Sequence, residues 1–190
     1  MTKPLEALCD EELLQRIAKA DRAAFAVLLE RHLERVQGLG QRMLGERSEA
    51  EDVAQEIFLK LWRSPHLWQP GRAKFSSWLS RVCANACIDR IRRRKPLALE
   101  DQAEPVDPGA GPLGAALQAE RARRVNQALQ DLPERQRLAI VLCHYQGYSN
   151  KEGAQIMQVS VEAMESLLAR ARRHLKSALA KDVKALLHDE

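Results

Sequence analysis

The chain has 190 residues with 30 Lys/Arg and 26 Asp/Glu, so its formal net charge is +4 and its pI is about 9.0. The net charge is +5 over residues 1–95, −4 over residues 96–118 and +3 over residues 119–190. Two basic blocks around an acidic spacer suit a polyanionic partner. The sequence has no apolar run of membrane-spanning length and no secretory h-region, so we expect a cytoplasmic protein with reduced thiols.

Catalytic and metal-binding motifs are missing from the sequence. Cys83 and Cys87 lie four residues apart, and His144 follows Cys143, but no CxxC spacing occurs. Free cysteine commonly behaves as a small buried hydrophobe, which favours burial over a metal site. GxGxxG, P-loop, HExxH and nucleophile-elbow motifs are also missing. We therefore expect no enzymatic activity, no metal, no cofactor and no small-molecule substrate.

Helical periodicity governs the first half of the chain. Apolar spacing predicts helices over about 10–20, 21–44, 48–63 and 75–95. Asp21 is an N-cap candidate, and Ser48 with Glu51 has the pattern of a capping box. The segment 64–74 contains two prolines and is predicted to be a loop. We expect Trp62 to lie in the core, whereas Trp68 in the loop is harder to bury.

A linker is predicted between two helical domains. Residues 96–118 include four prolines and three glycines without periodicity, which is typical of a flexible, semi-extended linker. The second domain, 119–190, is expected to contain four helices. The sequence therefore predicts an all-α protein with one small helical domain over 1–95 and another over 119–190.

Residues 149–176 have the pattern of a helix-turn-helix. Ser149 begins a capping box with Glu152, and Ser160 is a second N-cap candidate before a longer basic helix. An αα-hairpin that only packs, with its arginines in solvent, is the simpler interpretation. Small and polar residues at the start of the second helix can approach base edges, however, and this favours DNA binding.

At this point the sequence resembles the extracytoplasmic-function (ECF) sigma factors, two-domain promoter-recognition subunits of bacterial RNA polymerase. AEDVAQEIFLKLW (50–62) is similar to the helix that binds the polymerase clamp, and KFSSWLSRVCANACIDRIRRRKP (74–96) is similar to the −10 segment. LPERQRLAIVLCHYQGYSNKEGA (132–154) and ARARRHLK (169–176) resemble the −35-binding domain. AMESLLARAR (163–172) is similar to a proteobacterial subset, some of whose members serve metal-resistance or stress regulons.

The resemblance implies three sets of site residues. Those expected to contact the β′ clamp helices of the polymerase core are Asp52, Gln55, Glu56 and Phe58. Those expected at the −10 element, where tryptophan and cations suit an unstacked base and its phosphates, are Trp68, Lys74, Ser77, Arg81, Asn85, Asp89, Arg92 and Arg93. Those expected at the −35 element are Ser149, Lys151, Ser160, Glu162, Ala163, Glu165, Ser166, Arg170 and Arg173.

The resemblance further implies that the polymerase β flap is a partner, and that an anti-sigma factor anchored in the membrane holds the protein inactive. Three residues depart from the usual family pattern: Gly153 replaces a bulky aliphatic residue, Glu165 replaces a basic one and Leu167 replaces an arginine. A carboxylate at 165 would prefer cytosine N4 to phosphate. Two alternatives stay open, namely a stand-alone helix-turn-helix regulator and an RNA-binding or antitermination protein.

Overall fold

The computed structural model describes residues 3–71, 73–97 and 113–188, and every regular element within these ranges is helical. The α-helices are α1 (Asp10–Ile17), α2 (Arg22–Leu44), α3 (Arg47–Arg63), α4 (Phe75–Leu97), α5 (Leu113–Gln130), α6 (Glu134–Ile140), α7 (Asn150–Met157) and α8 (Val161–His188). Short 3₁₀ turns lie at Leu5–Ala7 and Pro65–Leu67, and a π-helical turn lies at Val141–Tyr145. The predicted all-α class is confirmed.

The predicted linker, 96–118, is helical at both of its ends. Helix α4 continues to Leu97, and α5 begins at Leu113. Helix α4 ends one residue after Pro96, whose missing N–H interrupts the helical hydrogen-bond ladder. The middle of the predicted linker, 98–112, lies outside the described residues.

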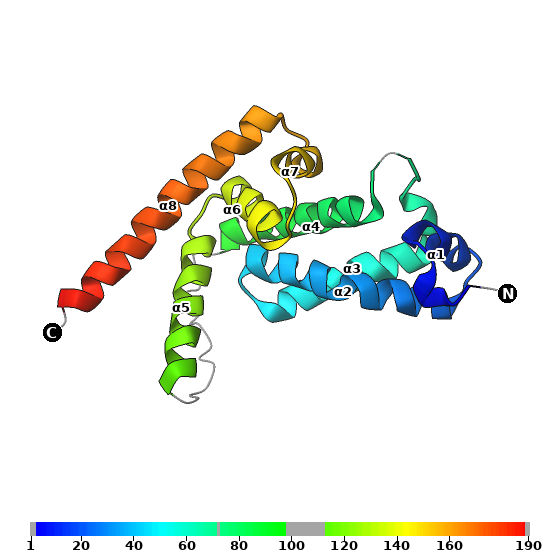
Figure 1. The fold of residues 1–190 in the computed structure, drawn as a ribbon, viewed down its shortest axis with the longest axis horizontal. Helices are drawn as coiled ribbons and strands as arrows, with labels where there is room; N and C mark the ends of the chain where they lie inside the picture. Colours follow the sequence, from blue (N-terminus) through cyan, green and yellow to red (C-terminus); the bar gives the residue numbers. More distant parts are fainter. Residues whose placement is uncertain (1–2, 72, 98–112, 189–190) are drawn as a thin grey trace.

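The first domain is built on a close crossing of α2 and α3, with α4 packed across both (Figure 1). Its core includes the fully buried Leu28, Met43 and Leu79. Gly40 permits the crossing, because a Cβ atom at this position would lie 3.1 Å from the Cβ atom of Ala50 and 3.2 Å from its Cα atom. Helix α3 therefore approaches the α2 backbone at a distance that a larger residue would prevent.

The helix starts confirm one predicted cap and correct another. Asp21 caps α2 by accepting a hydrogen bond from the Ala24 N–H at 3.1 Å. The capping box expected at Ser48 is wrong, since α3 begins at Arg47 and Glu46 is its N-cap residue. Ser48 therefore lies within the first helical turn. The backbone of Glu46 already has the extended conformation of an N-cap residue, so the helix begins earlier than the sequence motif suggests.

The tryptophans do not follow the expectation from sequence. Trp68 is only 6% exposed, and its ring lies edge-on to Phe75 at 5.8 Å. Its indole N–H donates to the Ala73 carbonyl at 3.1 Å, so the loop itself supplies the hydrogen bond that burial requires. Trp62, expected in the core, is half-buried beside Phe25 with 5.1 Å between the rings.

The second domain contributes to two apolar clusters. One lies within the domain and includes Leu129, Met164 and Leu168. The other is continuous with the core of the first domain, because α6, the π-helical turn and α7 lie over α4 and the end of α2 (Figure 1). Helix α8 extends away from this contact along one side of the molecule.

Candidate nucleic-acid and protein interfaces

Helix α3 carries an exposed strip on the side away from the core. Asp52 and Gln55 are exposed, and Leu59 is 45% exposed, which is unusual for a large apolar side chain. Phe58, also expected to contact the polymerase, is 3% exposed and belongs to the core, so its side chain is not part of this exposed strip. Sequence reasoning missed Leu59, although it follows Gln55 by four residues and Asp52 by seven, which are both helical spacings.

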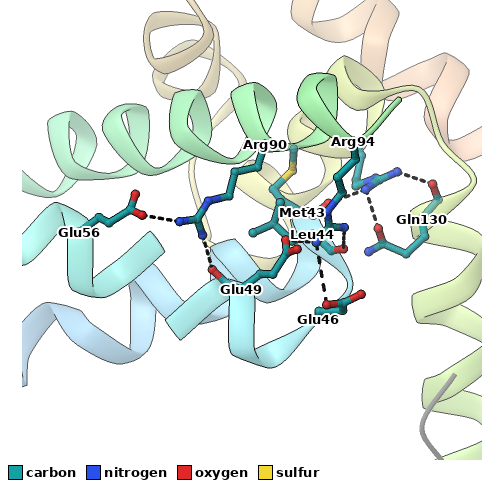
Figure 2. Close-up of polar contacts among 9 residues, drawn as sticks. Met43, Leu44, Glu46, Glu49, Glu56, Arg90, Arg94 and Gln130 are labelled. Atoms are coloured by element: carbon teal, nitrogen blue, oxygen red, sulfur yellow. Dashed lines mark hydrogen bonds and ion pairs between the residues drawn. The ribbon is translucent and has the colours of Figure 1, made fainter. Parts of the chain in front are cut away.

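The fourth predicted clamp residue, Glu56, is exposed but bound within the chain. Its Oε1 atom lies 2.6 Å from Nη2 of Arg90, and Nη1 of Arg90 donates to the Glu49 carbonyl at 2.8 Å (Figure 2). Arg94 likewise donates to the Leu44 carbonyl and forms an ion pair with Glu49. These bonds hold α4 against α3.

The arginines at the end of α4 differ in their exposure and in their partners. Arg90 and Arg94 are half-buried and bind α3, whereas Arg92 and Arg93 are exposed. Arg92 does have a partner, Glu134 of the second domain, at 2.9 Å. The sequence pattern treats these arginines alike, but their positions around the helix give them different neighbours.

A hollow of about 160 Å³ lies beside the start of α4. Leu67, Trp68, Gln69, Ala73, Trp78 and Arg81 line it. Trp78 is half-buried and stacks on Phe75 at 5.7 Å, with its ring more accessible than that of Trp68. Sequence reasoning assigned no role in binding to Trp78, although the FSSWL motif contains it.

The remaining −10 candidates lie along α4 and in the loop before it. Lys74, Asn85 and Asp89 are exposed, while Ser77 and Arg81 are half-buried. A second hollow of about 110 Å³ separates α4 from α7 and is lined by Lys74, Ser77 and Arg81 on one side and by Glu152, Gln155 and Ile156 on the other. The two hollows bring together Trp68, Lys74, Ser77 and Arg81, and α7 lies against part of this group. The other predicted −10 residues lie further along α4: Asn85, Asp89, Arg92 and Arg93.

Both caps expected in the helix-turn-helix are confirmed. The Ser149 hydroxyl accepts from the Glu152 N–H at 3.3 Å, and the Glu152 carboxylate accepts from the Ser149 N–H at 3.0 Å. Ser160 caps α8 by accepting from the Ala163 N–H at 3.1 Å. The Ser149 backbone and side-chain hydrogen bonds lower the pKa of Glu152, and bonds from its own N–H and from Ser160 lower the pKa of Glu162.

Helix α8 separates a buried side from an exposed polar side. Met164, Leu168 and Ala171 are buried. The −35 candidates of this helix and its cap are all exposed: Ser160, Glu162, Ala163, Glu165, Ser166, Arg170 and Arg173. Ser149 and Lys151 at the start of α7 are exposed as well. The structure therefore presents the whole predicted −35 set to solvent.

Gly153 is explained by its contact with α8. A Cβ atom at this position would lie 2.7 Å from Cε of Met164 and 3.4 Å from Sγ of Cys143. Met164 is fully buried and fills the space that an aliphatic residue at position 153 would occupy. The departure from the family pattern is therefore compensated between α7 and α8.

The cysteines do not form a metal centre within the described ranges, where no group of three or more potential His, Cys, Asp and Glu ligands occurs. Cys83 and Cys87 are fully buried, and hydrogen bonding of the Cys83 thiol with Cys87, together with burial, raises the pKa of Cys83. Burial also raises the pKa of Cys143. Among the helices that the structure describes, none is long and apolar enough to cross a membrane.

Two family models match the chain. Sigma-70 region 2 matches residues 28–96, which include α3 and α4 up to its penultimate residue, and Sigma-70 region 4 matches residues 122–175, which include the helix-turn-helix. The surfaces described above therefore lie in the two regions that define a sigma factor of the sigma-70 class, a transcription initiation factor.

Curated relatives identify the family within this class. The chain is 32% identical over 181 residues to the RNA polymerase sigma-H factor of Pseudomonas aeruginosa, covering 90% of this chain and 93% of that protein. It is 30% identical over 177 residues to the ECF sigma factor SigW of Bacillus subtilis, covering 87% and 94%. It is 35% identical to SigE of Mycolicibacterium smegmatis, covering 81% of this chain and 61% of that protein. The chain belongs to the ECF RNA polymerase sigma factor family.

Solved structures agree with this assignment. CnrH in complex with the cytosolic domain of CnrY matches with a TM-score of 0.69 and 27% identity, over 91% of this chain and 98% of that chain. RpoE of Bartonella quintana in complex with the anti-sigma factor NepR matches with a TM-score of 0.63 over 82% and 96%, and its 22% identity supports the fold alone.

Proposed function

We propose that this chain joins the RNA polymerase core, directs it to −10 and −35 promoter elements and so initiates transcription of a stress- or signal-responsive regulon. The observation that carries the proposal is the combination of an exposed strip on α3 with two separate DNA-binding candidates, α4 and α8. A stand-alone helix-turn-helix regulator would use α8 but would have no need of the α3 strip. The proposal includes no enzymatic activity and no cofactor.

The polymerase contact is proposed on α3. Asp52 and Gln55 offer a carboxylate and an amide to the β′ clamp helices, and Leu59 adds an apolar contact in place of the buried Phe58. An apolar side chain surrounded by polar ones fits the anatomy of a protein interface, which has an apolar centre and a polar rim. Glu56 also faces outward but shares its carboxylate with Arg90. The second domain would bind the β flap.

The −10 contact is proposed at the hollow beside α4. Trp78 offers the accessible ring on which an unstacked base can lie, Trp68 forms the wall behind it, and Arg81 supplies a cation. Lys74, Ser77, Arg92 and Arg93 would contact phosphates, with Asn85 and Asp89 at the edge of the duplex. The role expected for Trp68 is therefore divided between two tryptophans.

The −35 contact is proposed on the exposed face of α8. Glu162, Ala163, Glu165 and Ser166 lie in its first turns, as base-contacting residues of a recognition helix do. Arg170 and Arg173 follow on the same helix, where they suit phosphates, and Ser149, Ser160 and Lys151 lie at the starts of the two helices. Glu165 would accept a hydrogen bond from cytosine N4.

Regulation by an anti-sigma factor is proposed as well. CnrH, which shares 27% identity and both domains with this chain, was solved with the cytosolic domain of CnrY. We propose a membrane-anchored partner of this kind for a cytoplasmic chain. Purification from non-inducing cells should yield the chain with one stoichiometric companion that inhibits run-off transcription in vitro. Recovery of only fully active chain, alone or with polymerase, would contradict this.

The polymerase contact is tested by the double variant Asp52→Ala/Gln55→Ala. Both residues are exposed, so the fold should persist while promoter-specific run-off transcription with core polymerase is lost. The matched control is Glu11→Ala/Gln15→Ala, which removes the same kinds of exposed side chain from α1. Full transcription by the α3 variant, with helicity by circular dichroism equal to that of the control, would refute the contact.

A further inference from the structure

The first residue of helix α1 ties that helix to α2 through its carboxylate. Oδ1 of Asp10 accepts from Nη1 of Arg31 at 2.5 Å, and Oδ2 lies 2.9 Å from Nε2 of His32. Burial acts to raise the pKa of Asp10, but the hydrogen bonds and charges of His32 and Arg31 outweigh it and lower that pKa. Asp10 is therefore ionised at neutral pH. An ionised carboxylate can only accept, so Nε2 of His32 is the donor.

Further contacts make α1 a fixed part of the first domain. Nη2 of Arg31 donates to the Glu6 carbonyl at 3.2 Å and to the Leu8 carbonyl at 3.1 Å, so the segment before α1 also lies against α2. Leu8, Leu13 and Leu14 are buried in the core of this domain. Helix α1 is thus held by both apolar packing and charged hydrogen bonds.

The histidine that Asp10 binds belongs to a cluster of four rings. His32 is 6% exposed, and its ring lies edge-on to Phe75 with 5.2 Å between the centroids. Phe75, the first residue of α4, is itself buried and stacks on Trp78 at 5.7 Å, while Trp68 meets it edge-on at 5.8 Å. The two tryptophans line the hollow beside α4. The hydrogen bond of Asp10 is therefore two ring contacts away from Trp78.

These contacts can transmit orientation as well as stability. Phe75 has no hydrogen-bonding group on its side chain, so the direction of its ring depends on the rings around it, which favour edge-on or offset-stacked geometries. The ring of His32 is fixed in turn by its bond to Asp10. A histidine that only completed the core would not need to contact the ring on which Trp78 stacks.

A second contact leads from α1 to the same hollow. Helix α1 packs against the turn Pro65–Leu67, at the end of the molecule where the chain passes from α3 to α4 (Figure 1). Leu67 and Trp68 line the hollow directly. Both the loop side of the hollow and its Trp78 side are therefore supported from α1.

We infer that Asp10 and His32 are positioning residues for the −10 site: they hold Phe75, and through it Trp78, in the orientation in which an unstacked base can lie on the Trp78 ring. The inference deepens the proposed function and rests on the −10 surface proposed on α4. It also assigns a role in promoter binding to α1, which lies outside the residues 28–96 that match Sigma-70 region 2.

The test uses RNA polymerase holoenzyme and promoter DNA that the wild-type holoenzyme selects from a random-sequence library. Single abasic residues replace each −10 and −35 position in turn, on either strand, and binding is measured. An abasic residue removes base stacking but keeps the phosphate. At the position whose base lies on Trp78, it should weaken wild-type binding by about fivefold or more. Trp78→Ala should remove most of this abasic effect, which identifies the position.

The positioning role is tested at that position by Asp10→Ala, which breaks the bond to His32. It should reduce the abasic effect by about threefold and leave the effects at −35 unchanged. Asp10→Asn keeps an oxygen that can accept from His32, so it should retain most of the wild-type effect. Glu11→Ala is the matched control, because it removes an exposed carboxylate from the same helical turn.

A spectroscopic signature separates positioning from a general loss of structure. The indole N–H resonances of the isolated full-length chain are assigned with Trp→Phe variants. Asp10→Ala should shift the Trp78 signal more than that of Trp62, whose ring packs on Phe25. Helicity by circular dichroism should equal that of Glu11→Ala.

Three results would overturn the inference. A Trp78-dependent abasic effect that Asp10→Ala leaves unchanged would remove the positioning role and leave the −10 surface standing. Abasic effects that do not depend on Trp78 would refute the −10 surface itself, and the inference with it. Equal shifts of the tryptophan signals in Asp10→Ala would show a general loosening of the fold instead of a directed contact.

Discussion

Helices α4 and α8 both carry arginines and polar side chains suited to DNA, but they differ in access. Part of the proposed −10 surface on α4 lies against α7, and Arg92 is paired with Glu134. The proposed −35 face of α8 is open along its length, from Ser160 to Arg173. A basic helix in the sequence thus identifies a candidate surface, whereas its neighbours in the fold decide whether that surface is available.

The two helices also differ in how they use their arginines. Arg90 and Arg94 of α4 bind α3 and the end of α2, so they stabilise the first domain. Arg170 and Arg173 of α8 are exposed. Substitutions around α4 should therefore affect folding and the contact between the domains, whereas substitutions on α8 should affect DNA binding. The following predictions test this difference.

The largest effect is expected for Arg137→Ala. The substitution leaves the Met43, Gln130 and Leu132 carbonyls without their buried donor. Each buried group left without a hydrogen bond costs about 1–3 kcal/mol, so the free energy of unfolding should fall by about 3 kcal/mol in urea denaturation. The control Arg135→Ala, at an exposed position of the same helix, should change it by less than about 0.5 kcal/mol. Equal effects would contradict the role of Arg137.

The open face of α8 is tested by Glu165→Ala and Arg173→Ala. If Glu165 accepts from a cytosine, its loss should relax the preference at one −35 base pair by about 1–3 kcal/mol. Arg173→Ala should weaken binding to all −35 sequences alike, as the loss of a phosphate contact does. A binding survey of holoenzyme over randomised −35 sites measures both. Unchanged base preference in the Glu165 variant would rule out direct recognition by this residue.

The support of α8 by α7 is tested by Gly153→Ala. The new methyl group would overlap Cε of Met164, and the cost of overpacking should exceed the gain in helix propensity by about 1 kcal/mol. Met164→Leu removes the overlapping atom, so the double variant should recover most of the loss in urea denaturation. Gly38→Ala is the matched control, because its Cβ atom would meet only the flexible end of Arg42 at 3.3 Å. Additive effects at positions 153 and 164 would refute the compensation.

The smallest effect is expected between α4 and α7, where Oε1 of Glu152 lies 3.8 Å from Nζ of Lys74. Hydrogen bonds from Ser149 lower the pKa of Glu152 in the folded chain. The charged carboxylate therefore stabilises the fold when the pH is above the ordinary pKa of a glutamate. This contribution is lost as the pH falls through the lower pKa that Glu152 has in the folded state. Glu152→Gln should therefore show a smaller loss of stability than wild type between neutral pH and pH ~3. Identical pH profiles of urea unfolding would contradict this.

Local signals accounted for much of the fold. The capping boxes or caps at Asp21, Ser149 and Ser160 are where the sequence predicted them, because a cap depends on residues within one helical turn. Ser48 shows the limit of such signals, since the same motif can lie within a helix that begins one residue earlier. The order of the helices followed from periodicity, and the family followed from motifs spread over the whole chain.

Burial at single positions depended on side-chain packing that local sequence patterns do not specify. Phe58 belongs to a broad apolar face of α3 that the periodicity already indicated, yet the resemblance alone assigned it to a partner. Trp68 is buried because the loop carbonyl of Ala73 and the ring of Phe75 meet its indole. Neither contact can be deduced from the composition of a loop.

The sequence by itself determined that the chain is all-α, that it has two basic helical regions and that these suit promoter DNA, because helical periodicity, caps and charge are encoded within short segments. Only the tertiary structure decided that Gly153 makes room for Met164, that Arg90 and Arg94 bind within the first domain, and that α7 lies against part of the proposed −10 surface. These features join residues of different helices, and their energies depend on shape and burial, which no local pattern specifies.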